Sequence, residues 1–170
     1  MDIGCGNGGN LTILNSMGVE PSCLYGNDIM PNRIEEAKKR LPTMAHLECN
    51  NFLEASYQEN FFDCISLYTV LSSILDLDFQ KALIQKAKSL LNPGGAIIIY
   101  DFVYNNPANP DVRGIDIEFL KKIFGPVSYS IKKATIIPPL ARTFNKFPAI
   151  LRLMSVCSFL KSHRFIYLQK

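Results

Sequence analysis

A glycine-rich turn opens the chain at Asp2–Gly9 and is the part of the sequence best suited to hold a ligand. Glycines permit positive φ angles and let a ligand approach the backbone closely. A strand end followed by glycines and a helix start is typical of turns that cradle phosphate or nucleotide groups. Asp28 follows Gly8 by 20 residues, at the end of the next predicted strand. A carboxylate in that position can accept hydrogen bonds from ribose hydroxyls.

The glycine spacing alone leaves two kinds of cofactor open. Gly4, Gly6 and Gly9 also fit the G-x-G-x-x-G spacing of dinucleotide-binding proteins. That spacing does not separate dinucleotides from other adenosine cofactors, so a nicotinamide-dependent oxidoreductase is one alternative. The Asn92–Gly95 turn and the strand start at Phe62-Asp63 weigh against it.

The same turn resembles motif I of class I S-adenosylmethionine-dependent methyltransferases, an acid and an aliphatic residue before G-x-G-x-G. Gly26–Pro31, Phe62-Asp63 and Leu91–Gly95 resemble later motifs of that family in the same order, so that the resemblance extends to about residue 103. It departs at Asn51-Phe52, where the family often has an Asp before a small or aromatic residue. An Asn can still meet the adenine amino group through its side-chain oxygen. The motif I positions are filled by Asp2, Ile3, Gly4, Gly6 and Gly8.

The resemblance implies S-adenosylmethionine as cofactor and S-adenosylhomocysteine as product. It implies that the glycine turn passes the amino-acid moiety, that Asp2 orders this turn, and that Asp28 binds the ribose. The other predicted contacts are Asn51 and Phe52 beside the adenine, and Leu67 and Tyr68 beside the sulfonium. Asp2 as a simple turn cap and Phe52 as a core residue are the alternatives. The expected cofactor-binding residues are Asp2, Gly4, Cys5, Gly6, Gly8, Asp28, Ile29, Asn51, Phe52, Leu67 and Tyr68.

The acceptor side is less well defined by the sequence. Leu67–Val70 replaces the D/N-P-P-Y/F motif of enzymes that methylate amino groups of nucleic acids, so we expect no nucleic-acid acceptor. Transfer to a hydroxyl needs a proton acceptor or a polar partner. Open α/β sheets bind ligands at the carboxyl ends of their strands. The expected catalytic residues are therefore Asp101, Tyr104 and Asn105, which end or follow the fifth predicted strand.

Weaker similarity continues toward the C-terminus. Asp101–Pro107, Gly114-Ile115, Ile137–Arg142 and His163–Phe165 resemble a subgroup of bacterial methyltransferases associated with surface-polysaccharide or glycolipid synthesis. The resemblance implies a hydroxyl on a small molecule, a glycan or a lipid-linked acceptor. The apolar and basic segment 140–161 also permits peripheral contact with a membrane that presents such an acceptor. Packing of this segment on the sheet is the alternative.

Composition and charge narrow the class of protein. The chain has 170 residues, of which 48% are apolar and 11% aromatic. These values exclude a disordered chain and fit one domain over residues 1–170. No stretch approaches the roughly 20 apolar residues of a membrane span. Residues 1–110 hold 7 Lys and Arg against 12 Asp and Glu, whereas residues 111–170 hold 11 against 3. The basic C-terminal third favours an anionic partner, although a solvated face is equally typical.

The cysteine and histidine content predicts no metal site. Five cysteines without a C-x-x-C pair are typical of free thiols in a reducing compartment. The two histidines lie 117 positions apart, which provides no cluster of zinc ligands. We therefore expect a cytoplasmic protein, including the inner face of the membrane if segment 140–161 contacts lipid.

Strand-like and helix-like segments alternate along the first 103 residues, which predicts an α/β fold with a parallel sheet. By analogy to the family we expect a three-layer αβα sandwich with strand order 3-2-1-4-5-7-6 and strand 7 antiparallel. We expect a helix over Phe79–Leu91 capped by Asp78, and one over Leu140–Leu160 broken or kinked at Pro148. The strands are expected at Met1–Ile3, Ser22–Tyr25 (with Asp28 at its end), Ala45–Cys49, Phe61–Leu67, Ala96–Val103, Val127–Ile137 and Arg164–Leu168.

Family members carry one or two helices before motif I, and these are missing here. We therefore expect an N-terminally truncated domain whose cofactor pocket is open on one side. A homodimer in which a neighbouring subunit covers the pocket is left open. A non-catalytic remnant that keeps the fold and binds S-adenosylhomocysteine is the second alternative to an active enzyme.

Overall fold

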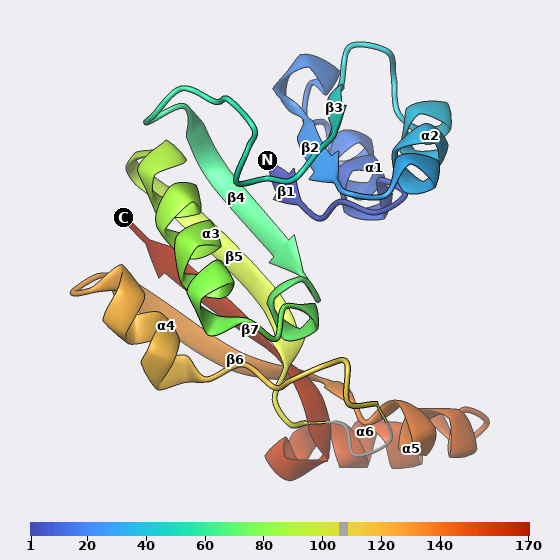
Figure 1. Ribbon diagram of the computed structural model, residues 1–170. Coiled ribbons are helices and arrows are strands. Elements are labelled where there is room, and N and C mark those ends of the chain that lie inside the picture. The colour runs from blue at the N-terminus through green and yellow to red at the C-terminus, as the bar shows by residue number, and fades with distance from the viewer. Residues whose placement is uncertain (106–108) are drawn as a thin grey trace.

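Seven strands form one mixed sheet in the computed structural model, which describes residues 1–105 and 109–170 (Figure 1). The strand order is β3-β2-β1-β4-β5-β7-β6, and β7 runs antiparallel to both of its neighbours. The predicted strand order and the predicted antiparallel strand are thereby confirmed. The strands are β1 (Asp2–Ile3), β2 (Tyr25–Asp28), β3 (His46–Cys49), β4 (Phe62–Tyr68), β5 (Leu91–Phe102), β6 (Ser128–Ile136) and β7 (Lys161–Gln169).

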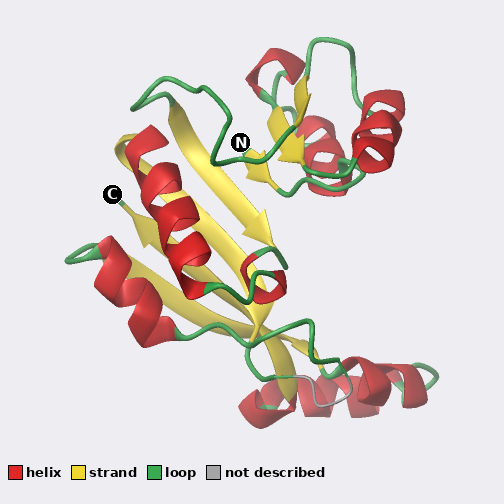
Figure 2. Cartoon of the chain, in the orientation of Figure 1, coloured by secondary structure: helices red, strands yellow, loops and turns green. Residues whose placement is uncertain are grey.

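Helices connect the strands, as the alternation in the sequence predicts. Figure 2 shows them on both sides of the sheet and in a projecting pair near the C-terminus. The α-helices are α1 (Gly9–Ser16), α2 (Pro31–Arg40), α3 (Leu77–Leu90), α4 (Ile117–Phe124), α5 (Pro138–Thr143) and α6 (Pro148–Val156). Three short 3-10 helices are η1 (Pro21–Cys23), η2 (Leu71–Ser73) and η3 (Ser158–Leu160).

The register of the strands assigns the helices to opposite faces of the sheet. Ile3 lies opposite Leu67, and both belong to the main core beneath α3 and α4, which pack side by side (Figure 1). Side chains alternate between faces along a strand, so Asp2 points to the other face. The α1 residue Asn10 reaches Asp2 there, and a second core cluster lies around Leu11. The three-layer αβα arrangement is confirmed.

An aromatic row crosses the α1 face of the sheet at its carboxyl edge. Tyr68 of β4 lies 5.8 Å from Tyr100 of β5, between ring centroids, and Tyr100 stacks on His163 of β7 at 4.8 Å. Phe165 contacts both tyrosine rings. The row therefore runs from the end of β4, the strand beside β1 and its glycine turn, to β7 in the C-terminal part of the sheet.

Three strands differ from the prediction by three residues or more. The strand β5 begins at Leu91, five residues before the predicted Ala96, and includes the Asn92–Gly95 segment that was expected to form a turn. Residues 21–23 form η1 rather than the start of a strand, because Pro21 occupies the first position of a 3-10 turn, and β2 begins only at Tyr25. The last strand begins at Lys161 and not at Arg164. Of the motif at Asp101–Pro107, residues Asn106 and Pro107 lie outside the described residues.

Two helix predictions also need correction. The cap of α3 is Asp76 and not Asp78: Asp76 Oδ1 accepts hydrogen bonds from the amides of Asp78 and Phe79 at 2.8 and 3.2 Å. The helix therefore begins two residues earlier than predicted. The break at Pro148 is confirmed, but α5 already ends at Thr143, and the segment forms two short helices and η3 instead of one kinked helix.

Candidate cofactor and acceptor site

The turn between β1 and α1 is shaped by three glycines in the left-handed region. Gly4, Gly6 and Gly8 have φ angles of 66°, 55° and 77°. The amide of Cys5 donates to the carbonyl of Asn27 at 2.8 Å, which fixes the turn to β2. A Cβ atom on Gly4 would lie 2.6 Å from Val70 Cγ2. Glycine is therefore required at position 4 both by the backbone angle and by the space available.

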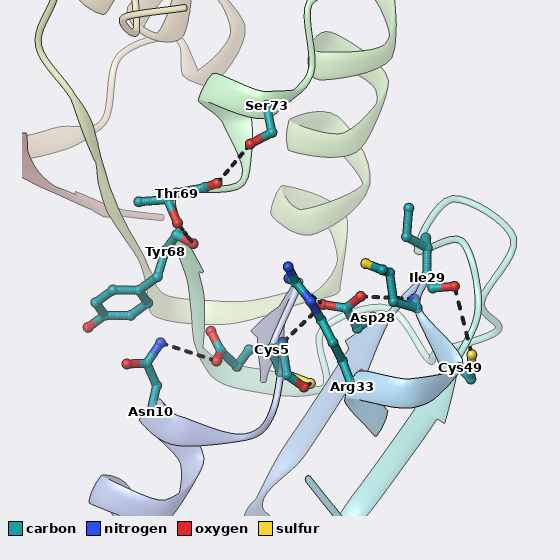
Figure 3. Close-up of polar contacts among 12 residues, drawn as sticks. Cys5, Asn10, Asp28, Ile29, Arg33, Cys49, Tyr68, Thr69 and Ser73 are labelled. Atoms are coloured by element: carbon teal, nitrogen blue, oxygen red, sulfur yellow. Dashed lines mark hydrogen bonds and ion pairs between the residues drawn. The ribbon is translucent and has the colours of Figure 1, made fainter. Parts of the chain in front are cut away.

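Asp28 ties the end of β2 to this turn. Its Oδ2 accepts a hydrogen bond from the amide of Gly6 at 2.9 Å, and its Oδ1 accepts one from the amide of Met30 at 2.9 Å (Figure 3). The side chain is buried, and Arg33 Nη1 lies 3.9 Å from Oδ2. A carboxylate has about four lone-pair sites, so each oxygen can still accept a hydroxyl. The side chain can thus bind ribose while it holds the turn.

Asp2 lies beneath the turn, as predicted. It is 1% exposed, and Ser66 Oγ donates to its Oδ1 at 2.6 Å, while Asn10 Nδ2 donates to Oδ2 at 3.4 Å. Burial raises the pKa of the Asp2 carboxyl, and the hydrogen bonds from Ser66 and Asn10 oppose that shift. These contacts connect β1, β4 and α1 next to the glycine turn. That Asp2 orders the turn for a cofactor stays a prediction.

The turn and the first residues of α1 suit the amino-acid end of S-adenosylmethionine. The first amides of a helix have no intrahelical acceptor, and no side chain among the described residues caps α1. These amides, at the positive end of the helix dipole, favour a carboxylate. A Cβ on Gly6 would meet only Arg33 Nη1, at 3.9 Å, within the described residues, so the turn is open on that side. The donor set and the open turn fit the cofactor.

The predicted cofactor residues differ in what their side chains can reach. Those of Cys5, Phe52 and Leu67 are buried in the two core clusters, so these positions offer a ligand only backbone atoms. For Phe52 the core interpretation is the one that the structure supports. Asn51 Oδ1 already accepts from the amide of Leu53 at 3.1 Å. Ile29, which is mostly exposed and follows Asp28, remains available beside the turn.

The three predicted catalytic residues lie in different environments. Asp101 is fully buried and accepts hydrogen bonds from the amides of Ser72 and Phe102 at 3.1 and 2.9 Å. Burial raises the pKa of Asp101, and hydrogen bonds from Ser72 and the Phe102 amide oppose the shift. Its observed role is therefore to hold η2 against β5. Contact with an acceptor stays a prediction for this residue.

Tyr104 and Asn105 lie nearer to solvent than Asp101. Tyr104 is half-exposed, and Lys133 Nζ of β6 donates to its hydroxyl at 3.2 Å. Asn105 Oδ1 accepts from the amide of Gly114 at 2.9 Å. Asn105 and Arg113 together line two cavities of about 260 and 290 Å³. Both cavities lie beside the segment that follows β5.

Sequence reasoning missed several residues of the site. Arg33, in the first turn of α2, pairs with Asp28. Its position shortly after Pro31 was the feature of the sequence that could have indicated this pairing. Thr69 has a φ of 56°, unusual for a residue other than glycine, at the end of β4. The pairing of Lys133 with Tyr104 could not be predicted, because the two residues lie 29 positions apart in the sequence. Among residues 1–105 and 109–170, no three His, Cys, Asp or Glu side chains gather as metal ligands.

Comparisons with known proteins identify this class of site. Residues 1–99 match the family described as methyltransferase domain, whereas no curated protein sequence matches. An S-adenosylmethionine-dependent methyltransferase from Mesorhizobium loti superposes with a TM-score of 0.73 at 14% identity, over 99% of this chain and 89% of that one. One from Archaeoglobus fulgidus gives 0.73 at 17% identity, over 99% and 84%. The N-methyltransferase NodS from Bradyrhizobium japonicum, in complex with S-adenosyl-L-homocysteine, gives 0.72 at 16% identity, over 99% and 76%.

The chain belongs to the methyltransferase domain family, since the match spans more than half of its length. Its fold is that of the S-adenosylmethionine-dependent methyltransferases to which it is similar. The oxidoreductase and the non-catalytic remnant are not favoured by these findings.

Proposed function

We propose that the protein transfers a methyl group to a hydroxyl of a small-molecule, glycan or lipid-linked acceptor. The observation that carries this proposal is the hydrogen bond from Lys133 Nζ to the Tyr104 hydroxyl, at 3.2 Å, just beyond the end of β5. The pair lies at the edge of the sheet where ligands bind in open α/β folds. It offers the polar partner that a hydroxyl acceptor needs.

Each residue of the proposed site has a distinct task. Bound S-adenosylmethionine supplies an electrophilic methyl group on a good leaving group. The glycine turn holds the amino-acid end of the cofactor and Asp28 holds the ribose. Positioning of this kind can supply roughly 7–11 kcal/mol of barrier lowering. The Tyr104 oxygen, with one lone pair engaged by Lys133, can accept a hydrogen bond from the acceptor hydroxyl with the other. That contact orients the acceptor oxygen toward the methyl group, and the proton released on transfer passes to solvent.

The cavities beside Asn105 support a polar or anionic acceptor. Arg113 lines both cavities and carries a charge that favours phosphate or carboxylate groups. The side-chain NH2 group of Asn105 can donate a hydrogen bond to an acceptor molecule while its Oδ1 accepts one from the Gly114 amide. Sugars and lipid-linked sugars combine hydroxyls with such anionic groups.

Transfer of a radiolabelled methyl group tests the proposal. Bacterial glycolipid and sugar-phosphate fractions are offered beside matched amines, and the methylated product is analysed for the atom modified. We expect a hydroxyl product and a rate at least tenfold lower in Tyr104→Phe. Tyr129→Phe is the matched control, because Tyr129 of β6 is also half-exposed beneath a lysine, Lys121 of α4. An N-methyl product, or equal rates in both variants, would contradict the proposal.

A further inference from the structure

Residues 138–160 form an arm between β6 and β7, made of α5, α6 and η3. Figure 1 shows it in orange and red, projecting from the end of the sheet away from β1–β3. None of the residues in these three helical segments is buried. The arm therefore has two sides, one toward β6 and one toward solvent.

The outer side of α6 is apolar. Ile150, Leu153 and Val156 recur at every third position, which places them along one face of the helix. Leu153 is 72% exposed and Val156 is 78% exposed. Leu151 and Met154 occupy the other side and are half-buried. A helix that is apolar on both sides is expected to be covered on both.

Phenylalanines extend this outer apolar face at both ends. Phe147, immediately before α6, is 56% exposed, and Phe159 in η3 is 68% exposed. Aromatic and aliphatic side chains on one side of a short helix are characteristic of segments that lie in the membrane interface. We refer to Phe147, Ile150, Leu153, Val156 and Phe159 as the outer apolar face.

Cations flank the outer apolar face along the sequence, and no acidic residue does so. Arg142, Lys146, Arg152 and Lys161 lie within or beside the arm. Residues 119–170 contain ten Lys and Arg and no Asp or Glu. Such a field attracts an anionic surface and is not compensated locally.

We propose that the outer apolar face docks on an anionic lipid bilayer, with the flanking cations against the head groups. A second copy is a poorer partner, because a symmetric contact would bring the same cations together. A bilayer satisfies both requirements, since it takes apolar side chains at its acyl boundary and cations at its surface. Within residues 1–105 and 109–170, no helix is long and apolar enough to cross a membrane. The inference concerns another surface than the cofactor site and does not depend on the acceptor.

Vesicle flotation of the full chain tests this docking without cofactor or acceptor. Vesicles of phosphatidylcholine are compared with vesicles in which about one third of the lipid is phosphatidylglycerol. Binding is expected only to the anionic vesicles and should fall at about 0.5 M salt, because surface charges are then screened. Leu153→Glu with Phe159→Glu, and separately Lys146→Gln with Arg152→Gln, should each weaken binding at least tenfold. Met17→Glu with Met44→Glu is the matched control. Both methionines are exposed, and both lie far from the arm in the sequence.

The outcomes separate the possible occupants. Binding to anionic vesicles that both arm variants weaken and the control variant keeps supports the proposal. Absence of binding to anionic vesicles, or equal binding by the Leu153→Glu and Phe159→Glu variant, overturns it. The proposal is overturned in favour of self-association if sedimentation shows a dimer that this variant converts to monomers and no vesicle binding is found. Failure of methyl transfer leaves these readouts unaffected, so the two proposals fail independently.

Discussion

The amide of Gly6 donates a hydrogen bond to Asp28 Oδ2 at 2.9 Å, and this contact joins the glycine turn to the end of the neighbouring strand. One carboxylate thereby shapes the turn and remains able to accept ribose hydroxyls. Ligand binding and local order therefore depend on the same side chain.

Replacement of Asp28 should weaken cofactor binding. In Asp28→Ala the Gly6 and Met30 amides lose their acceptor, and the ribose loses its partner. We expect the dissociation constant for S-adenosylmethionine, measured by calorimetry, to rise at least about tenfold, or 1.4 kcal/mol. Glu35→Ala, an exposed acid on α2, is the control and should bind normally. Unchanged affinity in Asp28→Ala would refute the assignment of the ribose site.

Alanine at position 4 should destabilise the fold through two separable effects. The positive φ costs about 1–2 kcal/mol for a residue with a Cβ, and the contact with Val70 Cγ2 adds overpacking of about 1–3 kcal/mol. Gly18→Ala is the control for φ alone, because no described atom lies within 4 Å of its Cβ position. Urea unfolding should show a larger loss for Gly4→Ala, and Val70→Ala should relieve part of it in a double-mutant cycle. Strict additivity would show that the contact is not strained.

Protonation of His163 should destabilise the folded protein as the pH is lowered through the range in which histidines titrate. Burial lowers the pKa of His163, and the charge of Asp101 only partly opposes this. The unfolded chain therefore takes up a proton at a higher pH, near 6.5, than the folded protein does. The contribution of His163 to the free energy of unfolding should decrease between about pH 7 and pH 5, by up to roughly 1.4 kcal/mol per unit of pKa difference. The raised pKa values of the buried Asp2 and Asp101 act in the opposite direction, so the comparison with a His163 variant isolates this contribution.

His163→Phe tests this origin of the pH dependence. A phenyl ring can keep the stack on Tyr100 but does not titrate. The slope of unfolding free energy against pH should flatten in this variant. His46→Phe is the control, since the exposed His46 ring also stacks on a tyrosine, Tyr25. An unaltered slope in His163→Phe would assign the pH dependence to other groups.

Loss of the α3 cap should distinguish Asp76 from Asp78. Asp76→Ala removes two hydrogen bonds to helix amides and should cost about 1 kcal/mol of unfolding free energy. Asp78→Ala removes only a charge in the first turn and should cost less. Thermal and urea unfolding of both variants measure the difference. A larger loss of unfolding free energy in Asp78→Ala than in Asp76→Ala would instead identify Asp78 as the cap.

The fold and the cofactor half of the site could be predicted because their signals are local. Glycines with positive φ, the acid after β2 and the strand alternation each depend on neighbours in the sequence. The N-cap of α3 was predicted at the wrong residue because, in the sequence alone, Asp76 and Asp78 are equally good N-cap residues. Only the first helical turn, which begins at Leu77, decides between them.

The acceptor half depends on contacts between distant residues. Tyr104 and Lys133 meet only because β6 joins the sheet beyond β7. Asp101 was predicted as a catalytic residue at the end of β5, and alternation along that strand directs its side chain toward η2. Phe52 similarly turns into the core beneath Lys86. The type of a residue does not reveal these orientations.

The aromatic row also gives this protein an optical signal of its own. The chain has seven tyrosines and no tryptophan, so its ultraviolet emission comes from tyrosine alone. Tyr68 and Tyr100 lie in the row at the carboxyl edge of the sheet. Occupancy of that edge should therefore change the intrinsic fluorescence, and titrations can be followed without a dye or an introduced label.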